Sequence, residues 1–216
     1  MILETKPDGY FEHKRNEMLS FIDIPVAKCL DLGCGRGGYL DLLKSKYQNL
    51  ETWGIEIDSE SGAIAKSKGH NVSIGNAEKM IDDLPDNYFD LITCNDVLEH
   101  FLNTYIILEK LKNKLSSNGK IISSLPNIRY YKPMFEYLFQ GDWKYREAGV
   151  MDKTHYRFFT KKSIQRMYKD AGFQIVTNEG INKGKSLKPY LVNALFLFSM
   201  DDIKYPQFAT VVKKKN

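Results

Sequence analysis

Glycines and an acid are concentrated in one short stretch, Cys29-Leu-Asp-Leu-Gly-Cys-Gly-Arg-Gly-Gly38, which predicts a strand, a glycine-rich turn and then a helix. Glycine lets a ligand approach the backbone where a side chain would block it, and a helix N-terminus directs amide groups at a polar ligand. Gly33, Gly35 and Gly38 also have the spacing of a dinucleotide-binding loop. That spacing alone is weak evidence, because open α/β sheets bind many kinds of ligand at the carboxyl ends of their strands.

Asp31, two residues before the first glycine, helps to distinguish a dinucleotide from a positively charged ligand. A carboxylate at this position repels a pyrophosphate and attracts an ammonium group. S-adenosylmethionine carries a sulfonium and an ammonium and has no phosphate, so Asp31 favours it over a nicotinamide dinucleotide. The next predicted strand ends in Gly54-Ile-Glu-Ile-Asp58, where Glu56 can accept hydrogen bonds from both hydroxyls of a ribose. Glu56 does not discriminate, because a dehydrogenase uses an acid in the same way.

With Asp31-Leu-Gly-Cys-Gly35 as its glycine loop and Glu56 as its ribose acid, the chain resembles class I S-adenosylmethionine-dependent methyltransferases. The resemblance implies S-adenosylmethionine as the cofactor. It implies cofactor contacts by Arg15, Asp31, Gly33, Gly35, Glu56, Ile57, Asn76, Ala77, Asn95 and Val97.

Different parts of the cofactor are assigned to different members of this set. Asn76 and Ala77 would flank the adenine, at a position where the family often has Asp and where an amide can still hydrogen-bond. Asn95 and Val97 would line the methionine end. Arg15 would bind the cofactor carboxylate with its planar guanidinium, although a solvated helix arginine is an equally good interpretation of that residue.

The second half of the chain carries more specific motifs. Leu125-Pro-Asn-Ile-Arg-Tyr-Tyr131 and Asp152-Lys-Thr-His-Tyr-Arg-Phe-Phe-Thr160 resemble bacterial methyltransferases of surface-polysaccharide and glycosyl-transfer pathways, as does Tyr10-Phe-Glu-His-Lys-Arg15. This resemblance implies O-methylation of a small-molecule or glycan acceptor. It implies acceptor contacts by Tyr10, Asn127, Tyr130 and Tyr131. A quinone-like or other aromatic acceptor is an alternative, and so is a protein that binds the cofactor without catalysis.

Methyl transfer to oxygen or nitrogen requires an acceptor in line with the sulfonium, and usually a group that takes the acceptor's proton. His100, which ends Asn95-Asp-Val-Leu-Glu-His100, and His155 are the two histidines in family-like motifs near the expected cleft. We predict that His155 is the catalytic base, because its segment would meet the acceptor, whereas His100 would begin a helix beside the cofactor. A hydrogen-bonded structural role for His155 and catalysis by positioning alone are the alternatives.

The elements that must position these residues alternate along the chain, as in a parallel sheet with crossover helices. Strands are predicted at 27–32, 52–57, 71–74, 89–94, 120–125, 173–177 and 208–212, and helices at 38–47, 60–68, 99–115 and 160–171. Asn118 and Gly119 are expected to form a turn that follows the third of these helices.

These elements predict an α/β fold with a Rossmann-like, seven-stranded, mostly parallel sheet, helices on both faces and an insertion after strand five. We expect a single domain over residues 1–216. Its additions are an N-terminal helical segment at 1–25, an insertion or lid at 127–159 and a helical insertion at 183–204 before the last strand. A helix at 188–200 within the last of these would pack on the core or form a homodimer contact.

Composition excludes several other classes. The 31 basic and 27 acidic residues leave a net charge of only +4, and no base-binding Asn-Pro-Pro-Tyr type sequence occurs, so we expect no nucleic-acid partner. Cys29, Cys34 and Cys94 are odd in number and form no zinc-binding motif, so we expect reduced thiols, a cytoplasmic location and no metal. Neither a signal peptide in residues 1–11 nor stable membrane insertion is expected, because the longest apolar stretch, 190–200, is too short to span a bilayer.

Overall fold

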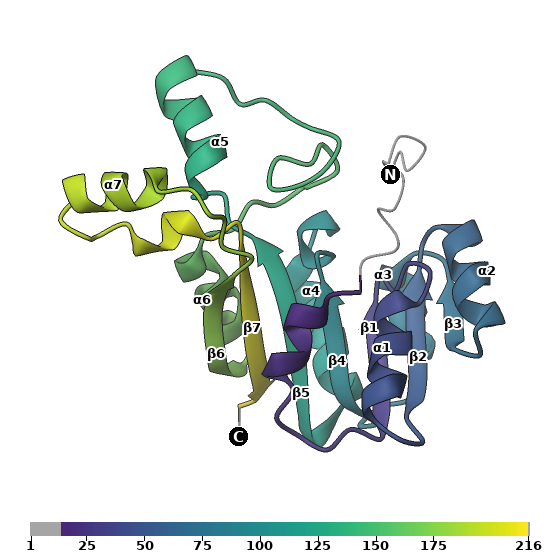
Figure 1. Ribbon diagram of the computed structural model, residues 1–216. Helices are drawn as coiled ribbons and strands as arrows, with labels where there is room; N and C mark the ends of the chain where they lie inside the picture. Colours follow the sequence, from purple (N-terminus) through teal and green to yellow (C-terminus); the bar gives the residue numbers. More distant parts are fainter. Residues whose placement is uncertain (1–13, 216) are drawn as a thin grey trace.

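The computed structural model of the chain describes residues 14–215, and a central sheet organises them (Figure 1). Its strands are β1 (Lys28–Leu32), β2 (Glu51–Glu56), β3 (Asn71–Ile74), β4 (Phe89–Asn95), β5 (Leu115–Pro126), β6 (Phe173–Ile181) and β7 (Gln207–Lys214). The α-helices are α1 (Gly38–Lys46), α2 (Ser59–Ser67), α3 (Ala77–Met80), α4 (Thr104–Lys114), α5 (Tyr131–Phe135), α6 (Lys161–Asp170) and α7 (Lys188–Leu195). Shorter helical turns are η2 (Asn16–Phe21), η3 (Ile81–Asp83), η4 (Leu98–His100), η5 (Glu136–Gln140) and η6 (Asp201–Lys204).

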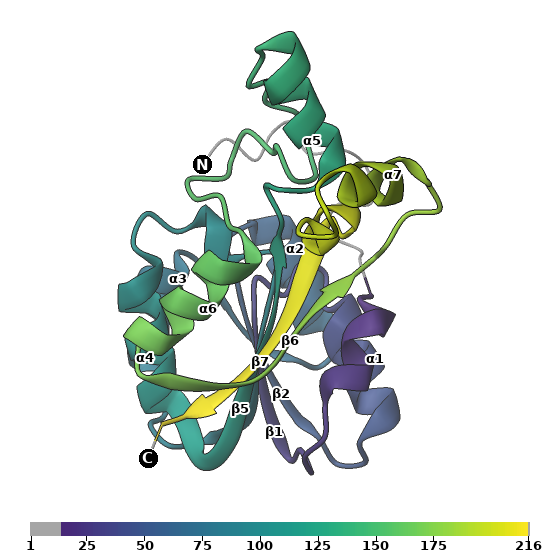
Figure 2. The same cartoon turned by 90° about the vertical axis from the view of Figure 1, so that its left-hand side faces the viewer.

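The strands lie in the order β3-β2-β1-β4-β5-β7-β6. Neighbouring strands are parallel except at β7, which runs antiparallel to both β5 and β6. Figure 2 shows α4 and α6 on one face of the sheet and α1 on the other. The predicted fold class, a seven-stranded mostly parallel sheet with helices on both faces, is therefore confirmed.

Helices on both faces explain the composition of the central strands. A strand that is covered twice needs apolar side chains in both directions. Leu30 and Leu32 of β1, Ile92 of β4 and Ile121 and Ile122 of β5 are accordingly fully buried. The core therefore lies on both sides of β1, β4 and β5 and holds the carboxyl ends of these strands in fixed positions.

The helix predicted at 99–115 is divided in the structure. Leu98–His100 forms the separate turn η4, and α4 begins only at Thr104, where Asn103 caps it by accepting a hydrogen bond from the amide of Ile106. The capping asparagine explains the break, because Asn favours the N-cap over a helix interior. The expected turn at Asn118 and Gly119 is likewise wrong, since these residues belong to β5.

Two segments project from the end of the sheet at which the parallel strands terminate (Figure 1). The insertion after β5 contains α5 and the π-helical turn η5, and its remaining loop passes over the strand ends. The segment before β7 contains α7, which ends at Leu195 and so is shorter than the helix predicted at 188–200. Leu195 and Phe198 are largely exposed, so this part of the segment is not packed on the core of the chain. Within residues 14–215, no helix combines the length and the apolar character needed to cross a membrane.

Gly180 in β6 allows the segment before β7 to pack on the sheet. A Cβ at this position would lie 2.2 Å from the ring of Tyr205, whereas a Cβ at Gly184 would approach nothing closer than 3.7 Å. We expect Gly180→Ala to cost about 1 to 3 kcal/mol of unfolding free energy by overpacking. At about 2 to 4 °C per kcal/mol for a chain of this size, the melting temperature should fall measurably. Gly184→Ala is the matched control, and equal melting temperatures for the two variants would contradict the prediction.

Candidate functional site

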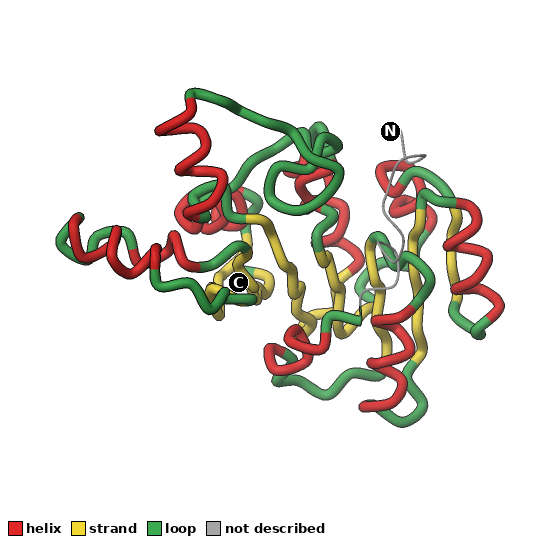
Figure 3. The backbone as a smooth tube through the Cα atoms, turned by 45° about the horizontal axis from the view of Figure 1, so that its top comes forward, coloured by secondary structure: helices red, strands yellow, loops and turns green. Residues whose placement is uncertain are grey.

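A cavity of about 490 Å³ opens at the carboxyl ends of β1, β2 and β4, where loops gather in the view of Figure 3. Its size lies within the range of about 300 to 1,000 Å³ that is usual for small-molecule sites. Of the predicted site residues, those that line it are Arg15, Asp31, Gly33, Gly35, Glu56, Ile57, Asn95, Val97, Tyr130 and His155. The fold therefore brings residues from six separate segments of the sequence to one cavity.

The glycine loop follows β1 and forms one wall. Gly33 and Gly35 have φ angles of +74° and +53°, which glycine adopts without strain. A Cβ on Gly33 would lie only 3.0 Å from the side chain of Val97, so a larger residue would also crowd the wall that Val97 forms. The amides of Gly33 and Cys34 donate to the carbonyl oxygen of Ile55, which ties the loop to β2.

Glu56 ends β2, and two backbone amides orient its carboxylate. Gly35 donates to one oxygen at 2.8 Å and Asp58 donates to the other at 2.9 Å. Each carboxylate oxygen keeps a second lone pair for a ligand hydroxyl. Burial raises the pKa of Glu56, and the two amide hydrogen bonds oppose that rise. The side chain is thus a preoriented double acceptor.

Asp31 is almost completely buried at the end of β1. The hydroxyl of Thr93 donates to its carboxylate at 2.6 Å. Burial, opposed by the hydrogen bond from Thr93 and by Arg15 and reinforced by Glu56, raises the pKa of Asp31 to about 7. Asp31 is therefore close to half protonated at neutral pH, and a cation that binds beside it would favour the carboxylate form.

Asn95 and Arg15 complete the polar part of this side. Both side-chain polar atoms of Asn95 are buried and have no hydrogen-bond partner among the described residues, which marks them as available to a ligand. Arg15 lies in the left-handed region and pairs with Asp96 and Glu17. The methionine part of the cofactor carries an ammonium and a carboxylate, and Asp31, Asn95 and Arg15 are chemically suited to those groups. The glycine loop and Glu56 are similarly suited to its ribose.

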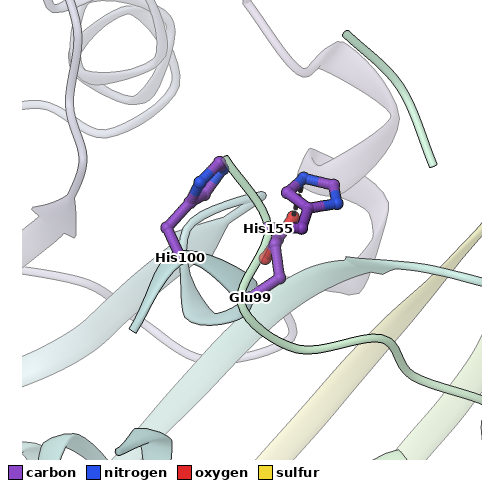
Figure 4. A group of neighbouring side chains, drawn as sticks. All are labelled: Glu99, His100 and His155. Carbon is purple, nitrogen blue, oxygen red and sulfur yellow. Dashed lines mark ion pairs between the residues drawn. The ribbon is translucent and has the colours of Figure 1, made fainter. Parts of the chain in front are cut away.

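Glu99, His100 and His155 also line the cavity and lie together, as Figure 4 shows. Their ligand-type atoms are all within 4.8 Å of one another. His155 Nε2 lies 3.7 Å from a carboxylate oxygen of Glu99, and the two imidazole rings meet edge to face with centroids 4.8 Å apart. Glu99 and His100 belong to η4, and His155 lies near the end of the insertion. The break before α4 and the return of the insertion to the sheet therefore assemble this cluster.

Backbone carbonyls hold both rings. Nδ1 of His155 lies 3.2 Å from the carbonyl oxygen of Val150, and Nδ1 of His100 lies 3.1 Å from that of Thr154. Glu99 has no exposed surface, and neither of its carboxylate oxygens has a hydrogen-bond partner among the described residues. Burial raises the pKa of Glu99 to about 8. A buried carboxylate without hydrogen bonds is unusual and requires an explanation.

Other predicted residues lie elsewhere. Asn76 does not line the cavity and caps α3 by accepting a hydrogen bond from the amide of Glu78, and Ala77 packs at the edge of the core.

The predicted acceptor contacts differ in their surroundings. Asn127 is fully buried, and its amide donates to the carbonyl oxygens of Asp202 and Tyr205, so its side chain connects β5 to the segment before β7. Tyr131 is buried against Tyr130. Tyr10 lies outside the described residues.

Reasoning from the sequence missed Glu99. It stands beside His100 in the motif after β4, and a carboxylate next to a histidine was the available signal. Nothing in the spacing of His155, more than fifty residues later, shows that it meets this pair. The three cysteines, by contrast, are all buried free thiols and take no part in the cluster.

Comparison with known proteins agrees with this geometry. The family model described as "Methyltransferase domain" matches residues 6–178. A solved S-adenosylmethionine-dependent methyltransferase from Archaeoglobus fulgidus has a TM-score of 0.67 at 20% identity, covering 87% of this chain and 86% of that one. This likeness concerns the fold.

Relatives of known name are distant. The chain is 28% identical to the ubiquinone biosynthesis O-methyltransferase of Rickettsia canadensis, over 74% of this chain and 67% of the relative. It is 26% identical to the demethylmenaquinone methyltransferase of Thermotoga maritima, over 71% and 73%. A probable (S)-tetrahydroprotoberberine N-methyltransferase of Papaver bracteatum is 24% identical, but the chain spans about a third of its length. The matched family model, the strand order and the cavity agree, and the chain belongs to the methyltransferase-domain family, with S-adenosylmethionine as its cofactor.

Proposed function

We propose that the protein transfers a methyl group from S-adenosylmethionine to a hydroxyl oxygen of a small-molecule or glycan acceptor. The observation that carries this proposal is that one cavity joins the glycine loop and Glu56 to the cluster of Glu99, His100 and His155. When bound, the cofactor supplies an activated methyl group on its sulfonium. The residues of the chain therefore have to orient the two reactants and control the proton of the acceptor.

In the proposed arrangement, Glu56 binds the ribose, Ile57 and Val97 contact the cofactor's apolar surfaces, and Asp31 faces the ammonium. Asn95 and Arg15 bind the methionine end. Asn76 and Ala77 remain proposed adenine contacts, which requires the start of α3 to approach a bound cofactor. These roles are inferred from the cavity and from the resemblance in sequence.

The acceptor would enter beneath the insertion at 127–159, which we propose acts as a lid within a single domain. Tyr130, which lines the cavity, is the proposed acceptor contact, and Tyr10, Asn127 and Tyr131 were expected beside it. His155 remains the proposed catalytic residue. Because its ring nitrogens face Val150 and Glu99, it would influence the acceptor's proton as part of the cluster.

The class of acceptor has two candidates. The motifs at 125–131 and 152–160 favour a glycan or sugar of a surface-polysaccharide pathway. The names of the Rickettsia canadensis and Thermotoga maritima relatives favour a quinone-like aromatic acceptor instead. We further propose a cytoplasmic location, consistent with three free thiols, and a homodimer as the state in which the exposed Leu195 and Phe198 are covered.

Radiolabelled S-adenosylmethionine tests the proposal directly. Purified protein would be incubated with labelled cofactor and a panel of sugars, nucleotide-sugars and reduced quinone precursors. Recovery of the label in a methyl ether of one acceptor class supports the proposed function and identifies the acceptor. Tight cofactor binding without transfer to any acceptor would instead indicate a protein that binds the cofactor without catalysis, and transfer only to nitrogen would contradict O-methylation.

Asp31 makes cofactor affinity depend on pH. With the pKa of Asp31 near 7 in the free protein, the cofactor's ammonium should lower that pKa, so binding releases a proton. Affinity should therefore rise by about five- to tenfold between pH 6 and pH 7.5 and then level off. Thr93, Glu56 and Arg15 are the neighbouring side chains that contribute to the pKa of Asp31.

Calorimetry in buffers of different ionisation enthalpy measures the released proton. Asp31→Asn is the control and should bind more weakly, with little change in affinity over this pH range. An equally steep pH dependence in Asp31→Asn would assign the proton to another group.

A further inference from the structure

We infer that Glu99, His100 and His155 bind a divalent first-row transition-metal ion at the acceptor side of the cavity. The inference rests on the proposed function, because the ion would act on the acceptor's hydroxyl. It goes against the expectation of no metal, which considered only the cysteine spacing and contiguous motifs.

The donor set is the first argument. Two imidazoles and one carboxylate are ligands for Zn²⁺, Fe²⁺, Mn²⁺ and Co²⁺, and a two-histidine, one-carboxylate set leaves coordination positions open. Among the described residues, Glu99, His100 and His155 form a group of possible metal ligands. One ligand atom from each residue lies within 4.8 Å of the other two. Figure 4 shows the three side chains close together, two from η4 and one from the last part of the insertion.

The second argument concerns how the rings are held. Metal-binding histidines usually donate their other ring N–H to a backbone carbonyl or carboxylate, which fixes the tautomer. Here Nδ1 of each ring lies within hydrogen-bond distance of a backbone carbonyl oxygen, that of Val150 for His155 and that of Thr154 for His100. In this tautomer Nε2 of each ring carries the lone pair that a metal requires.

The third argument concerns Glu99. Its carboxylate is fully buried, and both oxygens lack a hydrogen-bond partner among residues 14–215. The 3.7 Å between Oε1 of Glu99 and Nε2 of His155 is too long for a hydrogen bond. It suits two ligands of one ion, because metal–ligand distances of about 2.1 Å place ligand atoms roughly 3 to 4 Å apart. The widest separation, 4.8 Å, requires a modest side-chain rotation.

The position of the site indicates its role. With three protein ligands, an ion there has room for one or two oxygens of an acceptor, so we infer an acceptor with two adjacent oxygens, such as a vicinal diol or catechol. The ion would lower the pKa of the acceptor hydroxyl, whose proton passes to solvent. The acceptor oxygen then forms the O–CH₃ bond as the S–CH₃ bond breaks, and S-adenosylhomocysteine leaves as a neutral thioether.

Cobalt binding tests the site without relying on activity. Tag-free protein, stripped with chelator, would be titrated with Co²⁺ and followed by visible absorption and calorimetry. We expect one ion per chain, with affinity reduced at least tenfold in Glu99→Gln, His100→Gln and His155→Gln. Glu109→Gln, on the exposed face of α4, is the matched control and should bind as the unaltered protein does. Cofactor binding by each variant shows whether it is folded, and His100→Gln alters the least buried of the three ligands.

The possible outcomes separate the two proposals. Absence of Co²⁺ and Zn²⁺ binding, or unchanged binding in all three variants, overturns the metal inference. If chelator-treated protein still methylates hydroxyl acceptors at the full rate, the metal inference also fails while the proposed function stands. If the ion binds through the three residues but no hydroxyl acceptor is methylated, the site stands and the proposed function fails.

Discussion

Replacing His155 by Gln should lower turnover by about 100-fold or more while leaving the affinity for S-adenosylmethionine nearly unchanged. The imidazole lies 3.7 Å from Glu99 in the cluster that we propose acts on the acceptor, whereas Glu56 and the glycine loop are the proposed cofactor contacts. Glutamine keeps a polar side chain of similar reach but cannot take a proton or hold a cation as imidazole does. The loss should therefore appear in the chemical step and spare cofactor binding.

Steady-state kinetics with the identified acceptor, together with calorimetry of cofactor binding, measures the two properties separately. Tyr156→Phe, at the exposed neighbouring position, is the control and should keep its turnover. A purely structural His155 would give a different pattern, with a lower melting temperature and with cofactor affinity and turnover reduced together. That pattern would remove His155 from the reaction and leave positioning by Tyr130 and its surroundings as the better mechanism.

The strand, the glycine loop and Glu56 could be placed from the sequence because this part of the molecule is built locally. A buried strand, a glycine turn and a helix follow one another within ten residues from Cys29, and hydrophobic periodicity identifies each of them. Glu56, the proposed ribose acid, is found in the same way, at the end of the next strand. All seven strands were predicted close to their observed places for this reason.

The acceptor side was less predictable because it depends on contacts between distant segments. The break between η4 and α4 depends on Asn103 acting as a cap, which a count of apolar positions does not reveal. The motif containing Asn127 was read as an acceptor site, but its side chain is used to connect two backbone segments. The meeting of Glu99 with His155 follows from the path of the insertion, for which the sequence offers no periodicity.

The cofactor side permits an equally sharp test at Glu56. Glu56→Ala should weaken the binding of S-adenosylmethionine by about 2 to 4 kcal/mol, which corresponds to roughly 30- to 1,000-fold in the dissociation constant. Two ribose hydroxyls lose a charged acceptor. The amides of Gly35 and Asp58, which now donate to the carboxylate, also lose their partner, so the glycine loop loses a contact that orients it.

Glu56→Gln separates these two causes. Its amide oxygen can keep one backbone hydrogen bond, but its nitrogen cannot accept a second, so the variant should lose part of the affinity and keep most of the loop's order. Glu60→Gln, at an exposed position in α2, is the matched control and should bind the cofactor normally. Calorimetry with S-adenosylmethionine and with S-adenosylhomocysteine should show the same loss for both, because the ribose is common to them and the methyl group is not. An unchanged dissociation constant in Glu56→Ala would show that the ribose lies elsewhere, and a loss confined to S-adenosylmethionine would place Glu56 near the sulfonium instead.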